Sequence, residues 1–549
     1  MDAAVAAAKV GVGATKMKLK SIAALLAGLA VSGVAYAAPP PANLSAEAFD
    51  YAQLATGSRA AAALARSAAR MAARDPALAQ LAAQREDAEA RWTAIDARRL
   101  QSLGDPAPTA QAQSAALARL EQDLAAEIAR DDAELARRFP DFVEITSPAP
   151  LPLPELQRLL GPREALVFVL PTPEATYVWG VSRRSARWIK ADLGEAQLTQ
   201  AVAELRTALD PTGLVRAGVD ASGADAAQPL VRSFPRAVAW SLYQKLWAPI
   251  EPALGGADLV YVVASGALSS LPLSVLPTAA PTGSDADTET LRATPWLFRR
   301  HALAVLPSVS SVRALRRAGA RPEAGRPFAG FGDPVLSSDG QGWAKGLAPL
   351  PGARRELLAL AGALHAPPAA VATGADATEA AVRSAPLADV KVVAFATHGL
   401  LAGETGALNE PALVLTPPAA PSEADDGLLT ASEAAELRLS ADWVVLSACN
   451  TAAGDGKGGV AFGGEGLSGL ARAFFHAGAR ALLVSHWRVR DEAAARLTTE
   501  TIRAYAAHPE AGRARALRLA MENMLSDRSD PSLAQPSAWA PFVVAGEGS

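Results

Sequence analysis

The chain has 549 residues, half of them hydrophobic, so it has room for two or three domains with sizeable cores. Its 52 basic and 56 acidic residues give a formal net charge of −4. Nucleic-acid binding draws on a net basic surface, so this balance argues against nucleic acid as the main partner.

The first 37 residues have the pattern of a secretory signal. Lys18 and Lys20 form a basic start, residues 22–34 are apolar, and Ala35-Tyr36-Ala37 matches the small-x-small cleavage pattern. We therefore expect a signal peptide over residues 1–37 with cleavage after Ala37, a periplasmic or secreted mature protein, and no membrane association after cleavage. An uncleaved membrane anchor is the alternative, because the apolar run is near the short limit for spanning a bilayer.

Residues 44–139 are rich in Ala, Leu and charged residues and contain no strand-like run. The prolines within residues 105–108 interrupt this segment, which predicts an antiparallel helical hairpin. Its second arm has an amphipathic face at three- and four-residue spacing, made by Leu117, Leu120, Leu124 and Ile128. We expect a packing arm or a docking surface for a protein partner.

A Pro-rich joint over residues 140–154 separates this helical segment from a part of the chain that contains strand-like runs. Two β-branched and aromatic runs, 165–170 and 176–181, predict a β-hairpin. Further predictions in this half are helices at 195–210 and 236–250 and a buried strand at 259–263. Residues 302–306 are another short apolar run, closed by Pro307.

From residue 326 onward, strands and helices alternate. Residues 328–334 are predicted to be a strand end and turn. The predicted strands are 390–396, 443–447 and 481–485, and the predicted helices are 353–364, 430–437 and 466–478. Thr430 and Glu433 have the spacing of a helix capping box. The alternation predicts an α/β fold with a mostly parallel sheet flanked by helices, in which chemistry lies at the carboxyl ends of the strands.

Cys449 is the only cysteine of the chain, so it cannot form an internal disulfide. It follows the strand predicted at 443–447 and precedes a Gly-rich loop. A free thiol in an oxidising compartment is a liability unless it is buried or used. A buried, inert thiol is the alternative, but the place at a strand end favours a nucleophile.

Two of the six histidines follow apolar strand-like runs, and either could serve as the base for this thiol. His398 is followed by Gly399, whose backbone N–H can approach an oxyanion closely. His486 is followed by the bulky Trp487. Spacing alone favours His398 and leaves His486 as the alternative.

The Gly-rich residues 454–466 lack the Gly-Lys-Ser/Thr arrangement of a phosphate-binding loop, so we expect a flexible rim beside the nucleophile, with nucleotide binding as the weaker alternative. The chain also has no cysteine pair and no His-x-x-x-His spacing. We therefore predict no metal site and no cofactor.

Together, these motifs resemble the CHAT domain, a bacterial relative of caspases and separases among the caspase-fold cysteine peptidases. The most telling are Ala-Thr-His-Gly over 396–399 and Leu-Ser-Ala-Cys-Asn-Thr over 446–451. Further matching stretches, in chain order, are 266–272, 306–308, 332–334, 350–353, 464–467, 477–479 and 539–542.

The resemblance implies a CHAT domain over residues 155–546, with a pseudo-caspase-like half at about 155–325 and a catalytic half at about 326–546. It implies a His398–Cys449 dyad, with backbone N–H groups of Gly399 and Cys449 as the oxyanion hole. It also places the substrate pocket after the last predicted strand, at Trp487 and Asp491. Arg490 stands where the family commonly has an acidic residue, so the specificity of the family does not carry over.

The expected function is that of an exported cysteine endopeptidase that hydrolyses peptide bonds in a protein or peptide substrate. A catalytically silent scaffold of the same fold is the main alternative. A thiol hydrolase that acts on other acyl groups is a weaker one.

Overall fold

The computed structural model describes residues 46–56, single positions between 77 and 95, residues 108–138, 150–210, 233–317, 324–336, 347, 349–400, 408, 410–422, 425–447, 469–487 and 490–549. The chain forms two compact units, residues 1–152 and 153–549. The predicted signal peptide and Cys449 both lie outside the described residues.

In the N-terminal unit, the described residues between 46 and 138 are helical. Its longest element is α4 (Pro108–Arg138), which is 31 residues long. Arg85 pairs with Asp132, and Arg91 pairs with Glu127, each at 2.9 Å. From the first pair to the second, the residue number rises from 85 to 91 in one stretch and falls from 132 to 127 in the other, so the two helical stretches run antiparallel. Exposed pairs of this kind contribute less than about 1 kcal/mol each and mainly indicate the register.

The C-terminal unit is built on an eleven-stranded sheet with the order β3-β2-β1-β4-β5-β14-β13-β12-β8-β6-β7. Its first half contains the predicted hairpin, β1 (Glu164–Pro171) and β2 (Thr176–Ser182), which is extended at the edge by β3 (Ala186–Ala191). On the other side, β1 pairs in parallel with β4 (Leu259–Ala264), and β4 with β5 (Ala302–Val305).

The second half of the sheet is a parallel group of five strands. They are β6 (Arg326–Pro334), β7 (Val371–Gly374), β8 (Val390–Ala396), β12 (Trp443–Ser447) and β13 (Ala481–Ser485).

One strand, β14 (Phe542–Gly546), joins the two halves, because it pairs antiparallel with β13 and parallel with β5. The parallel strands of the two halves therefore run in opposite directions. As a result, the carboxyl ends of β8, β12 and β13 lie at one edge of the sheet, and those of β4 and β5 lie at the opposite edge.

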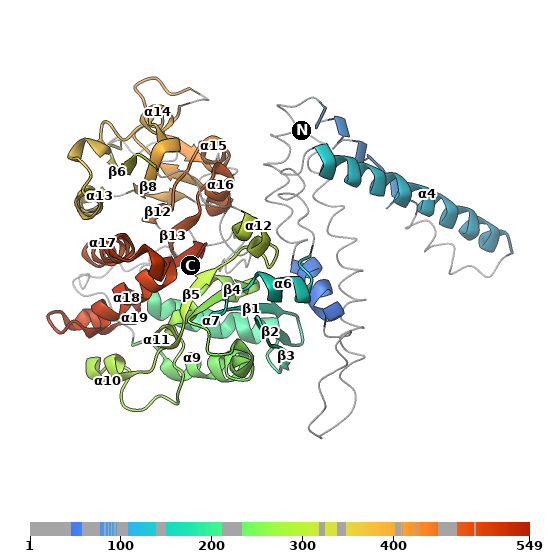
Figure 1. Cartoon of the computed structure of the whole chain (residues 1–549), viewed down its shortest axis with the longest axis horizontal. Helices are drawn as coiled ribbons and strands as arrows, with labels where there is room; N and C mark the ends of the chain where they lie inside the picture. Colours follow the sequence, from blue (N-terminus) through green and yellow to red (C-terminus); the bar gives the residue numbers. More distant parts are fainter. Residues whose placement is uncertain are drawn as a thin grey trace, which may run out of the picture. The chain divides into compact units, whose positions relative to one another are not determined.

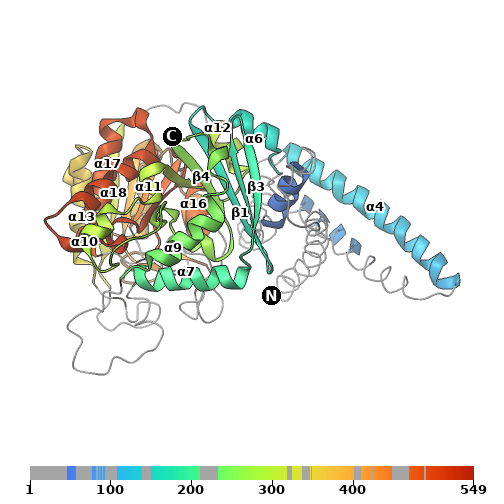
Figure 2. The same ribbon diagram turned by 90° about the horizontal axis from the view of Figure 1, so that it is seen from below.

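Helices cover both faces of the second half. On one face lie α13 (Pro351–Ala363) and α17 (Asp491–Ala507), with α18 (Arg513–Ser526) packed beside α17 (Figures 1 and 2). On the other face lie α15 (Ala431–Glu436) and α16 (Gly469–Ala477). A small separate sheet contains β9 (Gly399–Leu400), β10 (Ala412–Val414) and β11 (Leu428–Thr430).

The remaining α-helices of this unit are short, except for α7. They are α6 (Leu153–Leu159), α7 (Glu195–Leu209), α9 (Arg236–Leu242), α10 (Thr288–Ala293), α11 (Leu297–Arg300), α12 (Ser311–Arg317), α14 (Glu379–Ser384) and α19 (Pro536–Trp539).

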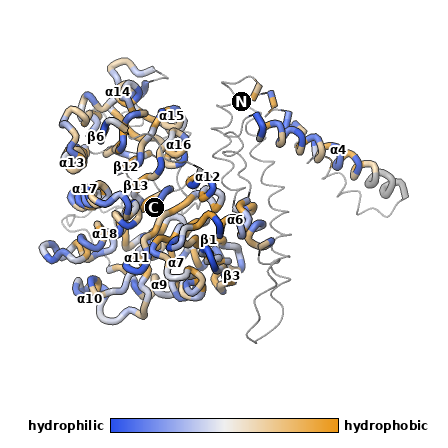
Figure 3. The backbone as a smooth tube through the Cα atoms, in the orientation of Figure 1, coloured by the Kyte–Doolittle hydropathy of each residue, from blue (hydrophilic) through white to orange (hydrophobic). Residues whose placement is uncertain are grey.

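The core of the second half is centred on stacked aromatic rings. Phe395 of β8 lies 5.5 Å from Phe331 of β6 and 5.4 Å from Phe474 of α16, measured between ring centroids. Aromatic pairs at such distances add to the hydrophobic gain of burial. Figure 3 shows hydrophobic colour on the strands near β1 and hydrophilic segments along α4.

The α/β fold with a large, mostly parallel sheet flanked by helices is confirmed. Each strand predicted between 165 and 485 is present, and Thr430 and Glu433 form the predicted capping box. The sequence prediction did not include β3, β14, α17 or α18. Within the part of the chain that the structure describes, no helix is long and apolar enough to cross a membrane.

Candidate active site

His398 follows the carboxyl end of β8 and is buried, with 6% of its surface exposed. Its carbonyl oxygen accepts a hydrogen bond from the backbone N–H of Val414 at 2.9 Å. The hydroxyl of Thr397 donates to the carbonyl oxygen of Val414. These two bonds attach the end of β8 to β10, so the backbone that carries the imidazole is held on both sides.

The next strand of the sheet, β12, ends at Ser447, which is paired with Ala396 of β8. Cys449 comes two residues later in the chain and lies outside the described residues. Successive side chains of a strand point to opposite faces. Leu446 belongs to the core under α15 and α16, whereas the Ser447 hydroxyl donates to Glu356 of α13 at 2.9 Å. The Ala396–Ser447 row therefore faces α13 and α17.

Gly399, the predicted oxyanion donor, is the first residue of β9 and is paired with Leu413 of β10. It is half-buried, and its neighbour Leu400 is 3% exposed. The small sheet thus begins immediately after His398, and its hydrogen bonds restrain the backbone around Gly399.

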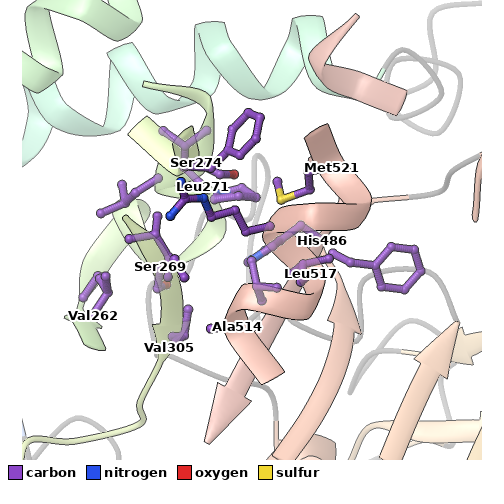
Figure 4. Close-up of a pocket in the computed structure, with 18 of the residues that line it drawn as sticks. Val262, Ser269, Leu271, Ser274, Val305, His486, Ala514, Leu517 and Met521 are labelled. Carbon is purple, nitrogen blue, oxygen red and sulfur yellow. The ribbon is translucent and has the colours of Figure 1, made fainter. Parts of the chain in front are cut away.

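His486, the alternative base, follows β13 and lines a mainly apolar cavity of about 40 Å³ between β4, β5 and α18. In Figure 4 its ring lies near Leu517 and Met521 of α18, with Leu271 across the cavity. Its Nδ1 has no hydrogen-bond partner among the residues that the structure describes.

Burial, assisted by the positive charge of Arg206, lowers the pKa of His486 to about 3. A general base works best when its pKa lies near the working pH. His486 is therefore a poor general base, because it binds a proton only in strong acid. His398, the predicted base, does not line this apolar cavity.

Trp487 is an interior residue, only 1% exposed. Its indole N–H donates to the carbonyl oxygen of Ser537 at 3.1 Å, and the guanidinium carbon of Arg206 lies 5.2 Å from its ring centroid. A cation over an indole face contributes about 0.5–2 kcal/mol. This contact joins α7 of the first half-sheet to the segment that follows β13.

Asp491, the second predicted pocket residue, is the first residue of α17, and its side chain lies outside the description. The preceding Arg490 is exposed and donates to Ser532 at 2.6 Å and to Asp530 at 3.2 Å. Arg490 therefore points toward the chain after α18 and forms surface contacts there.

The carboxyl end of β6, next to the strand that leads to His398, has an irregular backbone. Gly332 pairs with Ala396, and the register of β6 shifts between Gly332 and Pro334. Asp333 between them has a φ of 50°, which is unusual for a residue with a side chain. Such conformations cost of order 1–3 kcal/mol and persist where the surrounding structure enforces them. Burial also raises the pKa of Asp333 above its ordinary value.

Glu356 was missed by the sequence analysis. It is 4% exposed on α13 and lies next to the Ser447 row. A signal was available in the sequence, since Glu356 lies three residues after Ala353 and four before Leu360, on the same side of the predicted helix 353–364. An acidic residue on the apolar face of a predicted helix indicates a buried polar contact.

Across the described part of the chain, no group of three or more His, Cys, Asp or Glu side chains is arranged to hold a metal ion. The arrangement around His398 offers an imidazole, a strand end that leads to a thiol, and a backbone restrained by β9 and β10. Those groups suit acyl-transfer chemistry with a thiol nucleophile.

The fold and this strand-end arrangement define an α/β protein whose candidate chemistry lies at the carboxyl ends of neighbouring parallel strands. A family model described as the CHAT domain matches residues 236–547, which is more than half of the chain. The chain therefore belongs to the CHAT domain family, as its motifs predicted. No match was found among curated proteins.

Several solved structures are similar to this chain at low sequence identity. Two are crystal structures of the separase–securin complex from Saccharomyces cerevisiae, each with a TM-score of 0.40, at 10% and 8% identity. They cover 90% and 98% of this chain but only 40% of the separase chain. A third is the Arg-specific cysteine proteinase gingipain R, with a TM-score of 0.32 and 12% identity, covering 57% of this chain and 66% of that one.

Proposed function

We propose that this protein is an exported cysteine endopeptidase of the CHAT family, with Cys449 as nucleophile and His398 as its acid–base partner. The observation that carries the proposal is the pairing of Ala396 with Ser447. His398 and Cys449 each come two residues after this paired row. Neighbouring parallel strands in register bring equivalent positions to the same height, about 5 Å apart between strands.

The position of each residue in the chain supports the same partnership. His398 follows the end of β8 by two residues, and Cys449 follows the end of β12, the neighbouring strand, by two residues. An imidazole and a thiol that follow adjacent parallel strand ends suit a Cys–His dyad.

The reaction proceeds by acyl transfer. The Cys449 thiol gives its proton to His398 and its sulfur attacks the scissile carbonyl carbon. His398 then passes that proton to the leaving amine as the C–N bond breaks. Water then attacks the thioester and transfers a proton to His398. The carboxylate product leaves, and the thiol is restored.

The backbone N–H groups of Gly399 and Cys449 would stabilise the oxyanion of the tetrahedral intermediates. Fixed donors of this kind are worth about 10²–10³ in kcat each. Gly399 suits this role because β9 pairing restrains its backbone. The substrate side chain would lie near Asp491, while Trp487, which is 1% exposed, would support this segment from the interior.

Export belongs to the proposal as well. Cleavage after Ala37 would release a periplasmic or secreted enzyme that acts on a protein or peptide substrate. The helical N-terminal unit, where Tyr51, Leu54 and Leu120 are 44%, 52% and 48% exposed, would be available to a protein partner.

The test is covalent labelling of purified protein with a panel of peptide acyloxymethyl ketones, followed by mass-spectrometric mapping of the adduct. Cys449 is the only thiol, so a thioether adduct has a single possible position. We expect labelling of Cys449 that is lost in His398→Ala. The matched control is His476→Ala, because His476 is exposed on α16 outside the site.

Labelling that survives His398→Ala, or full peptidase activity in Cys449→Ala, would reject the dyad. An absence of labelling across the panel would support the scaffold function instead. Labelling by non-peptide acyl probes alone would indicate a thiol hydrolase that is not a peptidase.

A further inference from the structure

Glu356 is at the centre of a buried contact among α13, β12 and α17. The Ser447 hydroxyl donates to its Oε2 at 2.9 Å, and Thr498 Oγ1 of α17 lies 2.9 Å from its Oε1. Thr498 is fully buried and also lies 3.0 Å from the carbonyl oxygen of Ala494. One carboxylate thus connects two helices to the last residue of β12.

Packing of α13 does not by itself require this carboxylate. Leu357 and Leu360 of the same helix are 0% exposed and already attach it to the sheet. Burying a carboxylate costs several kcal/mol unless hydrogen bonds compensate it. A buried carboxylate at this position therefore contributes little to stability by itself. Its role is better sought in the groups to which it is hydrogen-bonded.

What Glu356 holds is the end of the strand that leads to Cys449. Ser447 is half-buried and is followed after two residues by the thiol. Two residues of chain span at most about 7 Å, so the position of Ser447 limits where Cys449 can lie. A misplacement of about 1 Å in a catalytic group can cost about 10² in rate.

We propose that Glu356 is a positioning residue, whose carboxylate fixes the carboxyl end of β12 through Ser447 and thereby sets the place of Cys449 relative to His398. Its catalytic consequence rests on the peptidase function proposed above. Its effect on β12 does not, because the hydrogen bonds exist independently of turnover.

The experiment compares Glu356→Ala, Glu356→Gln and Ser447→Ala in the full chain. Three quantities are measured: kcat and KM for the best peptide of the panel, hydrogen–deuterium exchange of the backbone amides in residues 443–450, and thermal stability. A glutamine keeps a hydrogen-bonding group for both hydroxyls but removes the charge, whereas an alanine removes both contacts.

We expect Glu356→Ala to lower kcat about 10²-fold with KM within about threefold of wild type. Exchange at residues 443–450 should accelerate in Glu356→Ala and Ser447→Ala. Glu356→Gln should restore slow exchange and most of kcat. The matched control is Glu379→Ala, which removes another buried carboxylate of the same half-sheet, 1% exposed, and should leave exchange at 443–450 unchanged.

Unchanged exchange at 443–450 in Glu356→Ala would overturn the proposal, even with a loss of thermal stability. So would equal impairment of Glu356→Gln and Glu356→Ala, which would assign the effect to charge. If wild type hydrolyses no peptide, the peptidase function fails while the exchange measurement still decides whether Glu356 positions β12.

Discussion

Gly332 of β6 lies directly against the backbone of Ala396 in β8. A Cβ atom added at Gly332 would be 2.1 Å from the carbonyl oxygen of Ala396, far inside van der Waals contact. Ala396 is two residues before His398 and is paired with Ser447 on its other side. The absence of a side chain at residue 332 therefore allows β6 and β8 to approach at the level where the candidate site begins.

Gly332→Ala should destabilise the protein and impair labelling of Cys449. The new methyl group meets backbone, so β6 must move away from β8, which we expect to cost about 1–3 kcal/mol. Urea unfolding measures the stability, and the ketone probe measures the site. Gly362→Ala in α13 is the control, because a Cβ there meets nothing within 4 Å and should be neutral or stabilising. Equal effects of the two substitutions would contradict the prediction.

His486 should make the protein progressively less stable in acid. Burial lowers its pKa to about 3, whereas the unfolded chain has a histidine pKa of about 6.5. As the pH falls from about 6.5 toward 3, the unfolded state takes up a proton that the folded state does not. The free energy of unfolding therefore falls, by up to about 1.4 kcal/mol per pH unit from this group.

Urea unfolding at several pH values between 7 and 4 measures this effect. His486→Leu should flatten the acid slope relative to wild type, while His476→Ala, at an exposed position, should leave it unchanged. Parallel slopes in wild type and His486→Leu would show that His486 binds a proton equally well in both states.

Glu379 should have the opposite pH dependence. It is buried on α14, and burial together with the charge of Glu433 raises its pKa to about 7, although its Oε1 accepts backbone N–H bonds from Asp426, Gly427 and Leu428. A raised pKa means that the folded state binds the proton more tightly. The stability of wild type relative to Glu379→Gln is therefore greatest below about 4.5 and falls as the pH rises through about 7.

Thermal or urea unfolding of both proteins from pH 4.5 to 8 tests this difference. A constant difference across the range would mean that Glu379 is ionised throughout. In that case the three N–H donors and Arg383, which donates to its other oxygen at 2.8 Å, would outweigh the cost of burial.

Thr430→Ala should cost about 1 kcal/mol of stability, because it removes the N-cap of α15. The Thr430 hydroxyl accepts from the N–H of Glu433, and the Glu433 carboxylate accepts from the N–H of Thr430 at 2.9 Å. Thr430→Ser retains both bonds and should stay within a few tenths of a kcal/mol of wild type. Urea unfolding decides the matter, and a loss in the serine variant equal to that in the alanine variant would argue against the cap.

Local features of the fold could be predicted from the sequence because short-range patterns determine them. The apolar runs before Ser447 and Ser485 predicted strands, and the spacing of Thr430 and Glu433 predicted a capped helix. Each depends on contacts between residues that are close in the chain. The order of motifs around His398 and Cys449 also identified the family, since that order can be read directly from the sequence.

The sequence by itself thus determined the family, the element types and the residues on which the proposed chemistry depends. Only the tertiary structure decided that β14 joins two half-sheets of opposite direction, that His486 is buried in an apolar cavity, and that Glu356 contacts Ser447 across 91 positions of sequence. These contacts join segments distant in the chain. They depend on which faces meet when the core forms, and no local period in the sequence encodes that choice.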